Sequence, residues 1–80
     1  MKAIVTVGLK PGVLDVQGKA VARALGELGF AGVAEARVGK VIELDLTGYQ
    51  DRAAAEKQVT DMCEKLLANT IIESYRVEIA

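Results

Sequence analysis

The sequence contains no histidine, and its 80 residues include a single cysteine. Without an imidazole the chain can form no Ser-His-Asp triad and no Cys-His dyad, and it can offer no histidine to a metal ion. The lone Cys63 allows neither an internal disulfide bond nor a cysteine-rich zinc site, and a free thiol suits the reducing cytoplasm. These absences favour a cytoplasmic module that works with other proteins over a self-sufficient enzyme.

Aromatic side chains and long apolar runs are scarce as well. Two tyrosines and one phenylalanine are too few for the stacking platform of an RNA-binding sheet. Ten Lys and Arg residues against eleven Asp and Glu residues give a net charge of −1, which provides no basic face for nucleic acid. No apolar run approaches the roughly 18 residues of a membrane span. We therefore expect neither nucleic acid nor a membrane as a partner.

The residues that are present repeat a pattern of strand, helix and strand within one domain, residues 1–80. Alternating apolar side chains predict strands over 2–9, 32–38, 41–47 and 71–79, and apolar side chains at helical spacing predict helices over about 15–28 and 50–68. Asp15 is the expected N-cap of the first helix, and close packing is the expected reason for Gly18 and Gly26 inside it. A tight turn at Gly39-Lys40 would join the two central strands as a hairpin.

The order β-α-β-β-α-β is that of the ferredoxin-like arrangement, an α+β fold. It predicts a four-stranded antiparallel sheet with both helices on one face. The opposite face would be polar with an apolar patch that includes Ile4, Val33 and Val41. Such a face, together with open edge strands, favours pairing with a second copy of the chain.

Side chains that could carry chemistry have simpler structural explanations. Cys63 lies on the apolar stripe of the second helix with Val59 and Leu66, so we expect it to be a small buried hydrophobe. Glu43 and Asp45 share one strand face and could bind Mg²⁺, but ion pairs with nearby cations such as Arg37, Lys40 and Arg76 are favoured. No glycine-rich loop has the spacing of a phosphate site. The sequence thus predicts no catalytic residue, bound cofactor or metal site in this chain.

Three segments carry a more specific pattern and read K-P-G-V-L-D-V-Q-G-K-A-V over residues 10–21, R-V-G-K-V-I-E-L over 37–44, and M-C-E-K-L-L-A-N-T-I-I-E-S-Y-R-V-E over 62–78. They resemble the PurS subunit family of phosphoribosylformylglycinamidine (FGAM) synthase. Together they span nearly the whole chain in the order of the family. The chain departs from the family at Val16 and Thr70, where the family commonly has proline. Both changes affect the entropy of the unfolded chain more than function.

The resemblance implies a non-catalytic subunit of a purine-biosynthesis ligase. Proteins of this family work with a glutaminase subunit, PurQ, which releases ammonia from glutamine, and with a large synthetase subunit, PurL. PurL uses ATP and Mg²⁺ to convert formylglycinamide ribonucleotide (FGAR) into FGAM, so these cofactors are expected on that partner. The small subunit is expected to act as a homodimer or larger homo-oligomer that assembles the other two and supports ammonia transfer between them.

The candidate partner interface consists of polar residues near the predicted turns: Lys10, Gln17, Arg37, Lys40, Asn69 and Glu73. Asn69 also suits the C-terminal end of a helix, so a structural role stays open for it. A regulatory dimer of the same topology that binds a small molecule is the alternative function. A free-standing small enzyme such as an isomerase is the least favoured, because the chain lacks a base with a pKa near neutrality.

Overall fold

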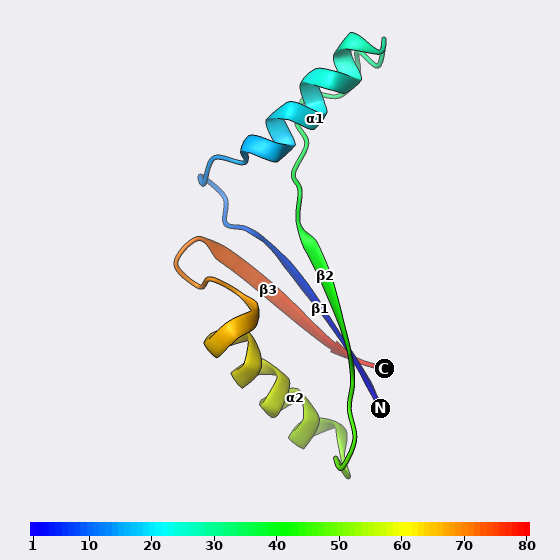
Figure 1. Ribbon diagram of the computed structural model, residues 1–80, viewed down its shortest axis with the longest axis vertical. Coiled ribbons are helices and arrows are strands. Elements are labelled where there is room, and N and C mark those ends of the chain that lie inside the picture. The colour runs from blue at the N-terminus through cyan, green and yellow to red at the C-terminus, as the bar shows by residue number, and fades with distance from the viewer.

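The computed structural model describes all 80 residues and contains one three-stranded antiparallel sheet (Figure 1). Strands β1 (Lys2–Leu9), β2 (Lys40–Asp45) and β3 (Glu73–Ile79) lie in the order β2-β1-β3. Val5 at the middle of β1 lies opposite Ile42 of β2 and Val77 of β3. The β-branched, alternating sequence of β1 therefore forms the central strand, with hydrogen-bonded neighbours on both sides.

Two helices connect the strands, and each begins at an aspartate. Helix α1 (Val16–Glu27) is capped by Asp15, whose side chain accepts a hydrogen bond from the backbone N–H of Gly18, as predicted. Helix α2 (Arg52–Met62) is capped in the same way by Asp51. It continues into a single π-helical segment, η1 (Cys63–Leu67), in which the N–H of Ala68 donates to the carbonyl of Cys63.

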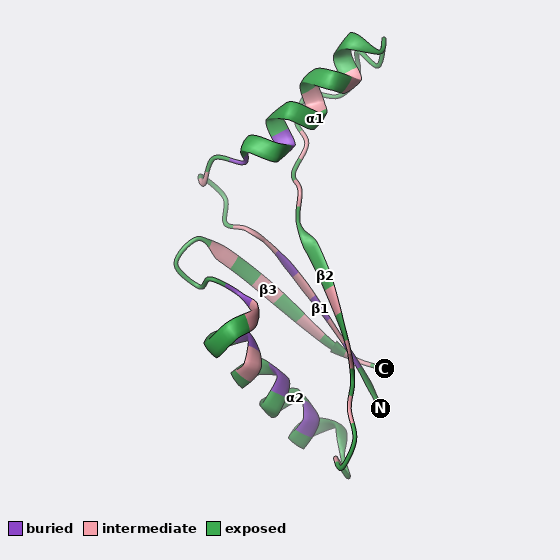
Figure 2. Cartoon of the chain, viewed as in Figure 1, coloured by how far each residue is buried: buried purple, intermediate pink, exposed green.

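The hydrophobic core lies between one face of the sheet and α2 with η1. Ala3, Val5 and Val7 of β1 are fully buried there against Val59 and Cys63. Figure 2 shows that burial is confined to this contact and to the base of α1. Only nine of the 80 residues are buried, so the core of the single chain is small.

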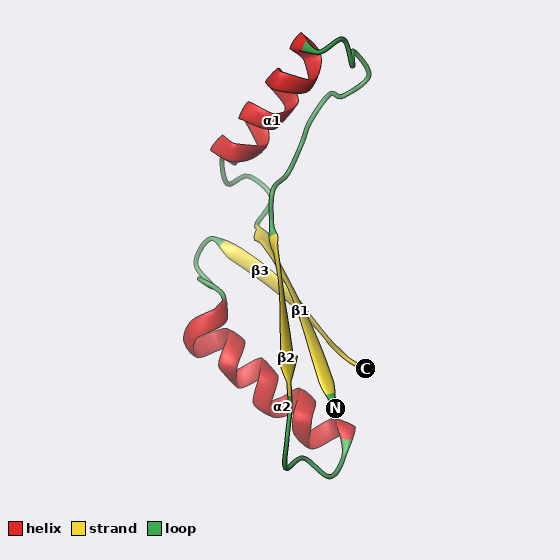
Figure 3. Cartoon of the chain, turned by 45° about the vertical axis from the view of Figure 1, so that its right-hand side comes forward, coloured by secondary structure: helices red, strands yellow, loops and turns green.

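Helix α1 does not lie on the sheet, and the prediction of two helices on one face is wrong. Figures 1 and 3 show that α1 extends beyond the end of the sheet, while α2 alone covers one sheet face. The molecule consequently measures 50 × 24 × 14 Å, and its radius of gyration is 16.1 Å. A compact chain of this length would have a radius of gyration of about 12 Å. We call residues 16–38, which comprise α1 and the segment that returns from it, the arm.

The predicted four-stranded sheet and hairpin are also wrong, whereas the α+β class is confirmed. No turn forms at Gly39-Lys40, and residues 33–39 instead run straight into β2. Gly39 passes so close to β1 that an added Cβ would lie 2.5 Å from the carbonyl oxygen of Val7. The segment 32–38 has the alternation of a strand but no neighbouring strand in its own chain, and residues 31–39 form no backbone–backbone hydrogen bond.

Candidate functional site

The arm joins the sheet through Asp15, which sits just before α1. One oxygen of its carboxylate accepts from the N–H of Gly18 and the other from the N–H of Val38, each at 2.7 Å. The side chain is buried, with 6% of the residue exposed. The bond from Gly18, then that from Val38, lower the pKa of Asp15, and the nearby charge of Arg37 adds to this. Asp15 thus ties the start of the arm to its end.

Arg37 makes the second part of this connection. Its guanidinium donates to the carbonyl oxygens of Leu9, Lys10 and Val13 at 3.3, 3.1 and 3.1 Å. These carbonyls belong to the last residue of β1 and to the loop that leads from it into α1, so Arg37 holds the returning segment against the outgoing one. We call residues 9–15 and 36–39 the joint.

A close backbone approach completes the joint. Gly18 lies against the carbonyl of Ala36, and a Cβ at this position would collide with the oxygen of Ala36. Close packing was predicted as the reason for Gly18, and the structure confirms it. The same prediction for Gly26 is wrong, because a Cβ there would meet no atom within 4 Å.

The turn between η1 and β3 is held by its own hydrogen bonds and by the joint. Asn69 accepts from the N–H groups of Ile71, Ile72 and Glu73, and its own N–H donates to the carboxylate of Glu73 at 2.7 Å. Lys10 adds two bonds from outside: its N–H donates to Ile72 at 2.8 Å and its ammonium group donates to the carbonyl of Thr70 at 2.7 Å. The turn and the joint therefore form one continuous, fixed surface.

All six predicted interface residues lie in this region, although they are far apart in the sequence. Gln17, Lys40 and Glu73 line a common cavity of about 360 Å³ together with Leu14 and Val16. Lys10 and Asn69 belong to the adjoining turn, and Arg37 belongs to the joint. The hydrogen bonds above give Lys10, Arg37, Asn69 and Glu73 structural roles as well. Their contacts with a partner remain a prediction.

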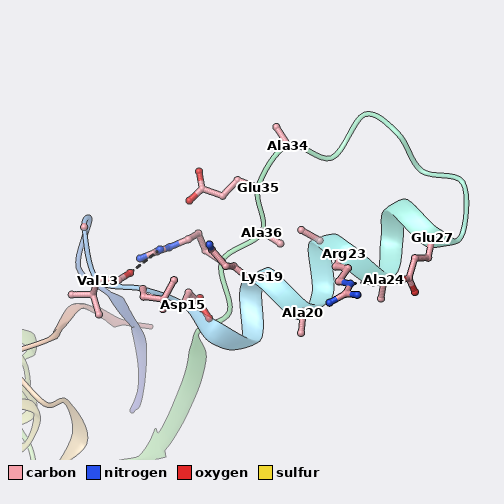
Figure 4. A pocket seen from close by; sticks show the side chains of 14 residues that line it. Val13, Asp15, Lys19, Ala20, Arg23, Ala24, Glu27, Ala34, Glu35 and Ala36 are labelled. Atoms are coloured by element: carbon pink, nitrogen blue, oxygen red, sulfur yellow. Dashed lines mark hydrogen bonds and ion pairs between the residues drawn. The ribbon is translucent and has the colours of Figure 1, made fainter.

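A larger groove of about 1100 Å³ runs along the arm between α1 and residues 34–37 (Figure 4). Its walls include the small residues Ala20, Ala24, Ala34 and Ala36, with the charged Lys19 and Arg23 beside them. Sequence reasoning missed this groove, because it assigned α1 to the sheet. The run of alanines on both sides of the groove is the signal that could have indicated it.

Three titratable groups outside the joint were singled out by their sequence context or have a shifted pKa. Tyr75 donates to the carboxylate of Glu64 at 2.6 Å, and this bond, with burial, raises the pKa of Tyr75 to about 12. Burial raises the pKa of the Cys63 thiol, which lies in the core as predicted. Glu43 forms an ion pair with Lys2 at 3.4 Å. An ion pair was predicted there, with a different cation.

The structure contains neither a group of side chains that could bind a metal ion nor a helix that could cross a membrane. The chain has no cluster of three or more Cys, Asp or Glu side chains that could hold a metal ion. Neither helix has the length and apolar character needed to cross a membrane.

The arrangement defines a class of protein: a small α+β chain with one face of its sheet covered by α2 and with an arm that extends beyond the sheet. The family model described as PurS, phosphoribosylformylglycinamidine (FGAM) synthase, matches residues 2–80. The chain belongs to the PurS family.

Similar proteins agree with this assignment. A PurS subunit of phosphoribosylformylglycinamidine synthase from Synechocystis is 51% identical over 73 residues, which are 91% of this chain and 72% of that protein. The structure of Bacillus subtilis PurS is 45% identical, covers 96% of this chain and 94% of its own, and has a TM-score of 0.85. A chain in the structure of PurLQS from Thermotoga maritima is 31% identical, with coverage of 96% and 93% and a TM-score of 0.86.

Proposed function

We propose that this chain is the small, non-catalytic subunit of FGAM synthase in purine biosynthesis and that it works with PurL and PurQ. The observation that carries the proposal is the match to the PurS family over residues 2–80, supported by the likeness to a chain of the PurLQS assembly. The complete enzyme converts FGAR, ATP, glutamine and water into FGAM, ADP, phosphate and glutamate. The site of this reaction, with its ATP and Mg²⁺, belongs to the large partner.

The role of the chain in this proposal is to assemble the two active subunits and support the passage of ammonia between them. Ammonia stays reactive only while it is unprotonated, and a subunit without histidine offers it no side chain that titrates near neutrality unperturbed. The cytoplasm, with its reducing conditions, is the compartment that suits both the free thiol of Cys63 and this pathway.

Self-association is the second part of the proposal, and the surface area of the chain supports it. The single chain exposes 5820 Å². A compact monomer of 8.5 kDa would expose about 4,650 Å². The excess of about 1,200 Å² exceeds the roughly 800 Å² that one partner buries in an interface of standard size.

Part of the exposed surface is apolar, both on the arm and on the core side of β2. Val21, Leu28 and Phe30 on the arm are 43%, 73% and 58% exposed. On the sheet, Ile42 and Leu44 of β2 point to the core side but are only half-buried, since α1 does not cover them. We infer that the arm of one copy covers the open part of the sheet of a second copy. A complete ferredoxin-like arrangement would then be formed between two chains rather than within one.

Reconstitution of the enzyme tests the main proposal. Purified PurL and PurQ from the same organism are assayed for FGAM formation with glutamine, and in parallel with ammonium chloride, with and without this chain. We expect the glutamine-dependent rate to require the chain and the ammonia-dependent rate to depend on it less. A full glutamine-dependent rate without the chain would refute the proposal.

Sedimentation equilibrium of the isolated chain tests self-association. We expect a dimer or a larger homo-oligomer at micromolar concentration, because the excess apolar surface is buried in it. A monomer at all concentrations would refute this part and leave the main proposal to the reconstitution. The same sample serves for calorimetry against amino acids and nucleotides, where tight binding would favour the regulatory dimer.

A further inference from the structure

We propose that the arm, residues 16–38, folds only when a second copy of the chain covers it. In a separated chain the sheet and α2 keep their structure, whereas α1 loses its helix. The inference rests on the self-association proposed above, and it adds a change of conformation to that proposal. Folding of α1 and assembly of the chain are then one coupled step.

The arm contributes nothing to the core of its own chain. Neither the buried core residues nor the partly buried side chains packed against them include a residue of the arm. Gly18, which has no side chain, is the only buried residue of α1, while Val21, Leu28 and Phe30 are exposed. Most of the stability of a helix in a protein comes from packing of its apolar face. Within a single chain, α1 lacks this source of stability.

The sequence of α1 does not replace the missing packing. The helix has 12 residues, and isolated helices shorter than about 12–15 residues are marginal in water. Gly18 and Gly26 lower its helix propensity further. The ion pair between Arg23 and Glu27, at 3.5 Å, joins two side chains that are 84% and 71% exposed, so it contributes little. The cap at Asp15 is the main local support, and it acts on the first turn alone.

The segment that returns from α1 is equally unsupported. Residues 31–39 form no backbone–backbone hydrogen bond, and no hydrogen bond or ion pair connects residues 19–28 with residues 31–38. The bonds of the joint, from Asp15 and Arg37, lie at the base of the arm and do not extend past Gly18. The joint therefore anchors the arm at its base but does not hold the two segments together along their length.

A second copy supplies the missing cover. The single chain exposes about 1,200 Å² more than a compact chain of its mass, which exceeds the roughly 800 Å² that each partner buries in a standard interface. Ile42 and Leu44 of β2 point to the core side of the sheet but are only half-buried. Because a two-fold contact repeats the same pair of surfaces, each copy offers this place to the arm of the other. Burial of the apolar side chains of the arm then offsets the entropy lost when it becomes ordered.

Amide hydrogen exchange of the full chain at several protein concentrations tests the inference. Mass spectrometry of peptides from residues 16–28 reports α1, and peptides from residues 52–67 report α2 with η1. For a dimer, we expect the exchange rate in α1 to fall as the inverse square root of the concentration, because α1 opens through the separated chain. Where sedimentation shows separated chains, α1 should exchange like an unfolded peptide while α2 stays protected.

Two results of this experiment would overturn the inference. One is exchange in α1 that does not depend on concentration while the chain is associated. The other is a separated chain in which α1 is as well protected as α2, and this result leaves the proposed function intact. A chain that is monomeric at every concentration refutes self-association together with the inference, and it leaves the role in FGAM synthase to the reconstitution.

A pair of alanine variants separates coupled folding from docking of a preformed arm. Gly26→Ala raises the helix propensity of α1 at a position with open surroundings, and Thr60→Ala is the control at an exposed position of α2. If α1 folds on association, Gly26→Ala should strengthen association up to about fivefold per chain, or about 25-fold in the dissociation constant of a dimer. Thr60→Ala should leave it unchanged, because α2 is folded in both states. Sedimentation equilibrium measures both, and an unchanged dissociation constant for Gly26→Ala would overturn the inference.

Discussion

The joint predicts opposite effects for two glycines of the same helix. Gly18 lies in the first turn of α1 against the carbonyl of Ala36, and Gly26 lies in the last turn with open space around it. Substituting alanine at each position changes the same atoms in the same kind of backbone. Any difference between the two variants therefore reports the surroundings of the added methyl group.

The magnitudes follow from helix propensity and from steric overlap. Alanine is more favourable than glycine inside a helix by about 1 kcal/mol, so Gly26→Ala should stabilise the chain by up to that amount. Gly18→Ala gains the same about 1 kcal/mol, but its methyl group collides with backbone atoms that cannot rotate away. Overpacking of this kind costs about 1–3 kcal/mol, and a backbone obstacle places Gly18 at the upper end. We expect a net destabilisation of about 2 kcal/mol.

Thermal unfolding followed by circular dichroism measures both effects. For a domain of this length, about 1 kcal/mol corresponds to a shift of about 4–8 °C in Tm. Gly18→Ala should therefore melt about 8–16 °C below the wild type and Gly26→Ala up to about 4–8 °C above it. All three proteins are compared at one protomer concentration, because self-association would make Tm depend on concentration.

The refuting result is a Gly18→Ala variant that melts at or above the wild-type temperature. Alanine would then fit beside residue 36, so α1 could not approach the returning segment as closely as the structure shows. The joint would lose its central contact. A Gly26→Ala variant that is destabilised would count against the open surroundings of that position.

Three titratable groups give further predictions. The pKa of Asp15 is lowered in the folded chain. Its carboxylate therefore stabilises the fold at pH values above the ordinary pKa of 3.8, and this stabilisation is lost as the pH falls through the pKa of the folded state. The urea midpoint of Asp15→Asn should lie below that of the wild type at neutral pH and approach it in strong acid. The pKa of Tyr75 is raised, so its contribution to the free energy of unfolding is present below pH 10 and is lost as the pH rises to about 12. Ultraviolet titration in a Tyr49→Phe background should show Tyr75 ionising near 12, and Glu64→Gln should lower that value. Cys63 is fully buried with a raised pKa, so a thiol reagent should modify the native chain only at the rate at which it opens, and rapid stoichiometric labelling would contradict its position in the core.

Local patterns in the sequence predicted the elements better than their arrangement. The N-cap at Asp15 follows from an interaction within three residues, and the spacing of apolar residues along α2 predicted the buried positions Val59 and Cys63; the structure confirms both. Leu66 was expected on the same apolar stripe, but it is 82% exposed. The π-helical turn at Cys63–Leu67 inserts an extra residue into the helical repeat, which rotates Leu66 away from the core. Nothing in the spacing of apolar residues indicates such a change of phase.

The placement of α1 could not be predicted from periodicity at all. An apolar stripe shows that a helix face is covered, but not whether its cover belongs to the same chain. The alternation of residues 32–38 has the same ambiguity, since a strand pattern does not identify the neighbouring strand. The candidate interface residues were selected because polar residues near glycines mark turns. The fold brings these residues together, although Arg37 and Lys40 lie in an extended segment and its strand rather than in a turn, and their contact with a partner stays a prediction. The exposure of Leu14 and Ile71 could not be predicted either, because it depends on where the fold places their segments.

The slender shape of the molecule gives the joint an influence that reaches beyond its own contacts. Helix α1 has 12 residues, which corresponds to a rod of about 18 Å fixed at one end. A tilt of about 10° at Asp15 would move the free end of this rod by about 3 Å, which is the length of a hydrogen bond. A small rotation at the joint therefore produces a larger displacement at the far end of the arm. Small changes at Asp15, Gly18 or Arg37 should misalign side chains such as Phe30 at the tip, although none of them lies there.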